Sequence, residues 1–301
     1  SLIDAKNFET IVLGIGETTA AVETDLRLVT GLETLKIDGV TTNGLDENLT
    51  INRISDGVKV QFVDTEGDFY DNTVALNYAT GVTAATIELD DFDAESSGDF
   101  ADLTVSSGIT DLSIAQKKIL GTAGDSSVET LTATGATTVN LSSADAALRI
   151  DTLTAAKMTT LNMSGTTAQT VNAGGSTKLT TISVSTEADV VLGSGSSIIS
   201  RSKDATITLD EGDDNLSFDI ANHYDNVIDM GTNTATTTSE DGDLLAIGGT
   251  MSGNTVIDLS STTDQLTTVN AVSNSAVQKG IESVDASNVT IATGTFNITG
   301  S

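Results

Sequence analysis

From about Thr130 onward, apolar and small polar residues alternate in short runs, several of which open with two threonines. These runs read TTVNLSS from Thr137, TTLNMSG from Thr159, TTISVST from Thr180 and TTVNAVS from Thr267. Such alternation is typical of β-strands that bury one face. The first three runs begin 21 to 22 residues apart, with further short apolar runs between them. This spacing predicts an all-β fold, a parallel β-helix or β-solenoid with several short strands in each turn.

The residue types favour strands over helices. Thr and Val are β-branched and suit a pleated, half-buried surface, while Gly, Ala and Ser allow tight corners between strands. Helical periodicity is confined to LSIAQKKIL, from Leu112 to Leu120, and SADAALRI, from Ser143 to Ile150. We expect one or two helical turns at most at these places.

A run of small, turn-forming residues, GTAGDSS from Gly121 to Ser127, predicts an approximate boundary between two parts of the chain. Before it, LTINRISDGVKVQFVD from Leu49 and ATIELDDFD from Ala85 predict longer strands with more aromatic residues. We therefore expect residues 1–122 to form a β-rich domain or an irregular solenoid. Residues 123–301 are expected to form the regular parallel β-solenoid.

The charge of the chain narrows the choice of partners. Lys and Arg number 13 against 43 Asp and Glu, which gives a formal net charge of −30. A nucleic acid or an anionic membrane would be repelled, so cations are the natural partners. The chain has no Cys, which excludes disulfides, thiolate metal sites and cysteine nucleophiles. No apolar run approaches the roughly 20 residues of a transmembrane segment, and the N-terminal residues do not resemble a secretory signal.

The stretch TITLDEGDDNLSFD, from Thr206 to Asp219, combines strand-like alternation with a crowded acidic centre. Its pattern predicts a strand, a turn and a second strand. Calcium binds six to eight oxygen atoms from carboxylates and backbone carbonyls, and a glycine lets the backbone fold close to the ion. Gly212 supplies the flexible backbone, and the acidic residues around it supply the carboxylates. The sequence therefore predicts a calcium site in this turn.

The Thr-, Ala- and Gly-rich strands, the phrases GLETL and GIESVDAS, the lack of Cys and the acidic EGDDNLSF together resemble calcium-dependent RTX-type surface-layer (S-layer) proteins of Gram-negative bacteria. Gly212, Asp214 and Leu216 match the fourth, sixth and eighth positions of the RTX nonapeptide, whereas Leu209 and Asp210 replace its first two glycines. The resemblance implies type I secretion, an extracellular location on the cell surface and self-assembly into a calcium-dependent two-dimensional lattice. It also implies that any outer-membrane polysaccharide is bound through a region outside this chain.

Three acidic clusters supply the candidate calcium ligands, and their alternative interpretation is a solvated acidic face. The candidates are Asp210, Gly212, Asp213, Asp214, Asp219, Asp225, Asp229, Asp241 and Asp243 in the first cluster, Asp64, Asp68 and Asp71 in the second, and Asp90, Asp91 and Asp93 in the third.

Other functions fit the sequence less well. Parallel β-helices include polysaccharide-cleaving enzymes, but the chain has few aromatic, Arg and Lys residues to hold a sugar polymer, and His223 is its single histidine. We therefore expect no enzyme activity. Outward threonines also occur in ice-binding solenoids, but the doublets are interrupted between Thr181 and Thr267. A repeat segment of a type I-secreted RTX adhesin remains the main alternative to an S-layer segment. We further expect the chain to be an interior fragment that continues beyond Ser1 and Ser301.

Overall fold

The computed structural model describes residues 1–15, 21–39, 48–64, 73–90, 102–117, 126–174, 176, 178–186, 188–193, 205–210, 214–219, 226–229, 244–248, 255–258, 268–271, 281–285 and 297–298. Every regular element within these ranges is a β-strand. The chain divides into two compact units, Ser1–Ala155 and Ala156–Ser301.

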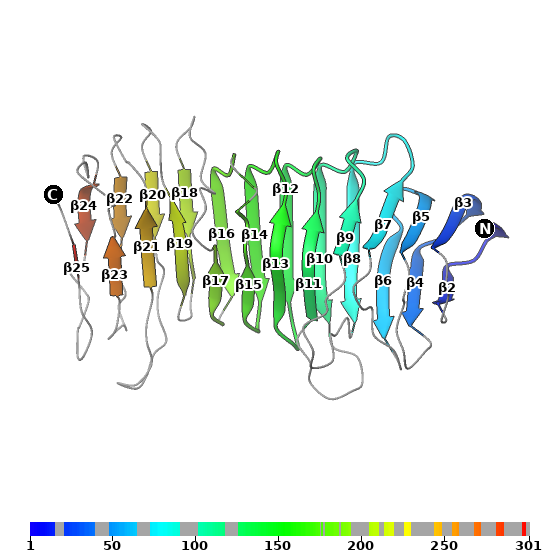
Figure 1. Cartoon of the computed structure of the whole chain (residues 1–301), viewed down its shortest axis with the longest axis horizontal. Coiled ribbons are helices and arrows are strands. Elements are labelled where there is room, and N and C mark those ends of the chain that lie inside the picture. Colours follow the sequence, from blue (N-terminus) through cyan, green and yellow to red (C-terminus); the bar gives the residue numbers. More distant parts are fainter. Residues whose placement is uncertain are drawn as a thin grey trace. The chain divides into compact units, whose positions relative to one another are not determined.

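Unit 1 consists of parallel strands that alternate between two sheets (Figure 1). Odd-numbered strands form one sheet and even-numbered strands form the other, so each strand pairs with the strand two places along the chain. The strands are β1 (Leu2–Lys6), β2 (Thr10–Ile15), β3 (Val22–Thr30), β4 (Thr34–Gly39), β5 (Leu49–Ile54), β6 (Lys59–Asp64), β7 (Thr73–Tyr78), β8 (Ala84–Asp90), β9 (Asp102–Val105), β10 (Asp111–Lys117), β11 (Ser126–Thr132), β12 (Thr138–Ser143) and β13 (Leu148–Thr154).

Unit 2 repeats the same arrangement, with even-numbered strands pairing among themselves and odd-numbered strands doing likewise. Both units are therefore built as parallel β-solenoids, which confirms the predicted fold class. Each turn has two strands rather than the several short strands that the sequence predicted. The strands are β14 (Thr160–Gly165), β15 (Gln169–Val171), β16 (Thr181–Thr186), β17 (Val190–Leu192), β18 (Ala205–Thr208), β19 (Asn215–Asp219), β20 (Asn226–Asp229), β21 (Leu244–Gly248), β22 (Thr255–Asp258), β23 (Thr268–Ala271), β24 (Ile281–Asp285) and β25 (Asn297–Ile298).

The core of each unit consists of apolar side chains stacked on their equivalents in neighbouring strands. In unit 1, Ile37 pairs with Phe62 and Phe62 with Leu89, and all three are fully buried. In unit 2, Ile182 pairs with Ile207, and both are 1% exposed. Because parallel strands keep equivalent residues aligned, alternation along one strand becomes a continuous apolar row across the sheet.

The one or two helical turns expected from the sequence are absent from the described residues of these segments. Residues 118–120 lie outside the described residues. Residues 112–117 belong to β10, and the segment from Ser143 to Ile150 joins the end of β12 to the start of β13. Gln116 faces the core and is 2% exposed, and its Oε1 accepts a hydrogen bond from the Ala146 N–H at 3.2 Å. An inward glutamine breaks the apolar alternation, so the local pattern resembled a helix.

From β5 to β12, each connection from an odd-numbered strand to the next even-numbered strand contains a tight four-residue turn. The N–H of its fourth residue donates to the carbonyl of its first, and a glycine takes the third position. Gly57 and Gly81 have φ values of +76° and +93°, a region that glycine occupies without steric cost. The fourth residue is apolar and buried. The turns span residues 55–58, 79–82, 106–109 and 133–136.

The first three threonine doublets stand at corners where even-numbered strands begin, whereas Thr268 of the fourth doublet opens the odd-numbered strand β23. Thr137 N and Thr138 N donate to the carbonyl oxygen of Thr110 at 2.9 and 3.0 Å, and Thr137 Oγ1 donates to the same oxygen at 3.1 Å. Thr180 and Thr181 repeat this arrangement on the carbonyl of Thr159. In these two doublets the first threonine therefore hydrogen-bonds the backbone of the preceding turn, and this structural role accounts for the doublet.

The length of a turn varies along the chain. Thr160 pairs with Thr181, 21 residues further on, in agreement with the spacing of the doublets. In unit 1, Lys59 pairs with Thr86, 27 residues further on, so strand pairing tolerates longer connections. The sequence boundary between residues 122 and 123 stays a prediction. Residues on both sides of it form strands of the same two sheets, because β9 pairs with β11 in one sheet and β10 pairs with β12 in the other.

Candidate functional site

The structure describes the side chains of four of the candidate calcium ligands. Asp210 is exposed, Asp229 is half-buried, and Asp90 and Asp214 are buried. Asp64 and Asp219 lie in β6 and β19, but their side chains are outside the described set. The remaining candidates also lie outside the described residues; they are Gly212, Asp213, Asp225, Asp241, Asp243, Asp68, Asp71, Asp91 and Asp93. Among the side chains that are described, no group of three or more His, Cys, Asp or Glu could hold a metal ion.

β18 and β19 confirm the two strands predicted on either side of the acidic residues, and they lie in different sheets. The predicted turn at residues 211–213 lies outside the described residues. Asp214, just before β19, is 1% exposed, and its Oδ1 accepts a hydrogen bond from the Val190 N–H at 2.8 Å. Val190 begins β17, the neighbouring strand in the sheet. One oxygen of this candidate ligand therefore already satisfies a buried backbone donor.

We expect Asp214→Ala to lower the free energy of unfolding by about 1–3 kcal/mol even without calcium, because the Val190 N–H would stay buried without its acceptor. Asp210→Ala, at the exposed position of the same turn, is the control and should change stability by less than about 0.5 kcal/mol. Urea denaturation of both variants in chelator measures the difference. Equal stability of the two variants would show that Asp214 does not support the backbone.

A charged network crosses β6, β8 and β10 on the even-numbered sheet of unit 1. Glu88 is 6% exposed, and its carboxylate oxygens lie 2.9 Å from Lys59 Nζ and 2.7 Å from Lys117 Nζ. Burial acts to raise the pKa of Glu88, but the hydrogen bonds and positive charges of Lys117 and Lys59 outweigh it and hold the pKa below its ordinary value. Glu88 therefore stays ionised, and the charges of Lys59 and Lys117 balance its own. Its role is structural.

Asp90, two residues further along β8, is 4% exposed and accepts a hydrogen bond from the Gln61 side chain at Oδ2. Its Oδ1 is buried and has no hydrogen-bond partner among the described residues. Burial raises the pKa of Asp90, and the charge of Glu88 adds to the effect, whereas Gln61, Lys117 and Lys36 act against it. Positive charges from β10, which adjoins β8, and from β4, two strands away, thus already influence this carboxylate, which weakens its attraction for a metal cation.

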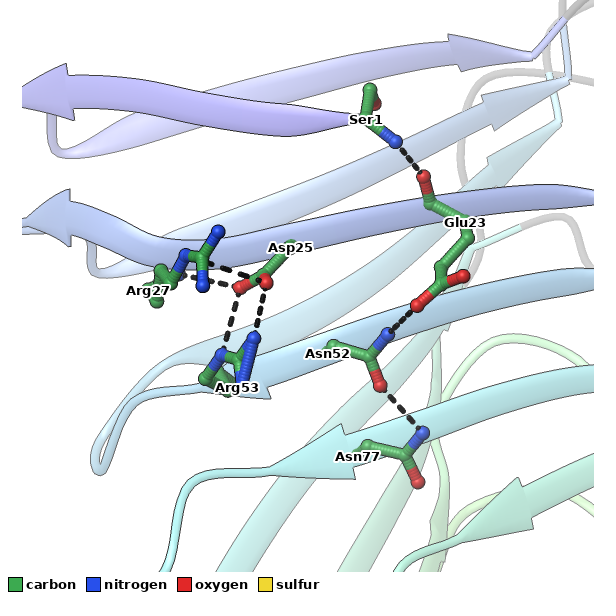
Figure 2. Close-up of polar contacts among 7 residues, drawn as sticks. All are labelled: Ser1, Glu23, Asp25, Arg27, Asn52, Arg53 and Asn77. Carbon is green, nitrogen blue, oxygen red and sulfur yellow. Dashed lines mark hydrogen bonds and ion pairs between the residues drawn. The ribbon is translucent and has the colours of Figure 1, made fainter.

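Asp25 lies between two arginines on the odd-numbered sheet of unit 1 (Figure 2). Arg53, on β5, donates from Nε to Asp25 Oδ1 at 3.0 Å and from Nη2 to Oδ2. Arg27, on β3 beside Asp25, donates its backbone N–H to Oδ1 at 3.0 Å, and its Nε lies 3.7 Å from Oδ2. The hydrogen bond from Arg53 is the main cause that lowers the pKa of Asp25 below its ordinary value.

Arg53 occupies a β-bulge and has a left-handed backbone. The pairing of β5 with β7 shifts between Asn52 and Ile54, so Arg53 is the extra residue. Its φ is 61°. For a residue with a Cβ, this left-handed conformation is unfavourable by about 1–2 kcal/mol. Bulges redirect side chains and often lie next to functional sites. Here the bulge directs Arg53 to the carboxylate of the neighbouring strand.

A row of amide contacts runs beside this cluster (Figure 2). Asn52 Nδ2 donates to Glu23 Oε1 at 2.7 Å, and Asn77 Nδ2 donates to Asn52 Oδ1 at 2.9 Å. The three side chains come from β3, β5 and β7, which are adjacent in the sheet. They connect three successive turns through side-chain hydrogen bonds.

Neither the Glu88 network nor the Asp25 cluster follows from local sequence patterns. Arg53 lies 28 residues from Asp25, and Lys117 lies 29 residues from Glu88. The tight-turn glycines were the available signal, because aligning DGV, TGV, SGI and TGA, which begin at residues 56, 80, 107 and 134, would have set the register between strands.

No described part of the chain forms a helix that is long and apolar enough to cross a membrane. No protein family model, curated protein or solved structure matches the chain. The arguments for its function therefore come from its own residues and fold.

Proposed function

We propose that this chain is a structural segment of a calcium-dependent RTX-type S-layer protein that assembles with copies of itself into a two-dimensional lattice on a bacterial cell surface. The observation that carries the proposal is the solenoid architecture of each unit, in which parallel strands of successive turns stack on one another. Such a fold presents long regular faces to neighbouring molecules. A structural role, without catalysis, is the function that uses these faces most directly.

The charge of the chain supports a role for calcium in this proposal. A net charge of −30 repels other copies of the chain and also opposes compact folding. Divalent cations bound between or within chains would relieve both effects. Asp210 directly follows Leu209, whose N–H donates to the Asp229 carbonyl at 2.9 Å, so the two acidic residues belong to adjacent turns. Oxygen donors of this type suit calcium, and these two residues would contribute to its binding.

Calcium should raise the melting temperature by several degrees, because an ion that binds only the folded state adds about 2.7 kcal/mol when its concentration is 100 times the dissociation constant. Magnesium should raise it less, since it is smaller and sheds water reluctantly. Calorimetric melting in millimolar calcium, in magnesium and in excess chelator measures the effect. An unchanged melting temperature across the three conditions would contradict a calcium-dependent fold.

A pair of variants separates specific calcium binding from general charge screening. Asp210→Asn should reduce the shift that calcium produces. Asp56→Asn removes another exposed carboxylate, which stands beside Gly57 and outside every candidate cluster. It should leave the shift unchanged. Equal reductions in both variants would indicate that calcium acts only by screening.

A further inference from the structure

We propose that Arg27 and Arg53 form a binding site for an oxyanion, meaning the carboxylate, sulfate or phosphate group of a ligand. The site lies on β3 and β5 of unit 1 and is independent of calcium binding. It is unexpected in an acidic chain, because two guanidinium groups and one carboxylate give this cluster a local charge of +1. A cluster of this sign within a chain of net charge −30 attracts anions that most of the surface repels.

Asp25 positions the two guanidinium groups without covering them. The side chains of Arg27 and Arg53 are 53% and 51% exposed, whereas that of Asp25 is 16% exposed. Among the described residues, Asp25 is the only acidic partner of either guanidinium group. Each group therefore keeps N–H donors for a ligand. Planar guanidinium forks match the oxygens of carboxylate, sulfate and phosphate groups, and they stay charged over the whole physiological pH range.

The bulge at Arg53 indicates that this arrangement has a use beyond stability. A left-handed backbone at Arg53 (φ 61°) is strained, and exposed ion pairs on average add little to stability. The ion pair with Asp25 is therefore a poor compensation for the strain. Strained residues that persist in a fold cluster at ligand-binding positions. Oxyanion binding gives a reason for an arginine where glycine would relieve the strain.

Titration with inorganic sulfate and phosphate, against chloride at equal ionic strength, tests the proposal. Isothermal calorimetry on the full chain should detect binding of both oxyanions. Arg27→Gln and Arg53→Gly should each weaken it at least tenfold. Because glycine accepts the left-handed backbone, Arg53→Gly should keep or raise the melting temperature.

Arg149→Gln is the matched control. Arg149 is also 51% exposed and binds one carboxylate with two nitrogens, Nε at 2.6 Å and Nη2 at 3.1 Å from Asp151 oxygens. Among the described ion pairs, no second arginine joins that carboxylate. This variant should bind sulfate as the unchanged chain does. Equal loss in Arg149→Gln and Arg53→Gly, or unchanged binding in Arg53→Gly and Arg27→Gln, would overturn the proposal.

Dextran sulfate in a parallel titration distinguishes a polymer-borne group from a free ion. Binding that is at least tenfold tighter per sulfate group than inorganic sulfate, and that is lost in Arg53→Gly, would assign the site to a polyanion. Equal affinity for both, lost in the same variant, would assign it to a free anion. Tight polymer binding that Arg53→Gly leaves unchanged would contradict a role of this site. None of these outcomes depends on calcium or lattice formation.

Discussion

Gly135→Ala should lower the free energy of unfolding by about 3 kcal/mol, the upper end of the usual cost of overpacking. A Cβ at this position would lie 2.1 Å from the carbonyl oxygen of Ser107 and 2.7 Å from that of Ile109. Both atoms belong to the tight turn of the neighbouring coil, in which Ile109 N donates to Ser106 O at 3.1 Å. Backbone atoms held in this way cannot move aside without breaking that turn.

Gly108→Ala provides the control for this prediction. Gly108 has the same place in the preceding tight turn, but a Cβ there would meet only Val82 O at 3.6 Å, an ordinary contact. Its replacement should be neutral or stabilise the fold by up to about 1 kcal/mol, through the unfolded state. Urea denaturation followed by circular dichroism measures both variants. Equal effects at the two positions would show that the turns do not stack as described.

Leu216→Ala should lower the free energy of unfolding by about 2–5 kcal/mol, because it empties a fully buried position. Leu216 is 0% exposed and pairs with Leu192, which is equally buried. The Leu216 side chain fills part of the core of unit 2, so shortening it to alanine leaves a cavity. The loss should be the same in calcium and in chelator, since no carboxylate is removed.

Val191→Ala is the matched control for Leu216→Ala. Val191 belongs to the same pair of strands, but its side chain faces outward and is 36% exposed. Its truncation should cost less than about 1 kcal/mol. Denaturation of the two variants under identical conditions makes the comparison. A larger effect at Val191 than at Leu216 would contradict the assignment of the buried face.

The fold class could be predicted because alternation is a local property. In TTVNLSS and TTISVST, every second residue faces the core, and the sequence shows this directly. The number of strands per turn could not be predicted in the same way, since it depends on which corners bring strands together. Inward polar residues such as Gln116 also concealed strands, because their partners lie on another turn of the chain.

The charged clusters were not predictable from local patterns for the same reason. Acidic residues near glycine are visible in the sequence, whereas the contact of Asp25 with Arg53 depends on strand register. The environment of Asp214 was also hidden, because the sequence shows a carboxylate but not the backbone donor at Val190. Sequence motifs therefore indicated the chemistry of single residues, and the solenoid determined their neighbours.

Electron microscopy of the purified chain, in millimolar calcium and in excess chelator, is the most direct test of the proposed function. An S-layer segment should form ordered two-dimensional arrays in calcium, and these arrays should disperse when the ion is removed. An adhesin segment would stay dispersed in calcium and bind a foreign surface instead. Dispersed particles in both conditions, or arrays that chelator leaves intact, would contradict calcium-dependent lattice assembly by this chain.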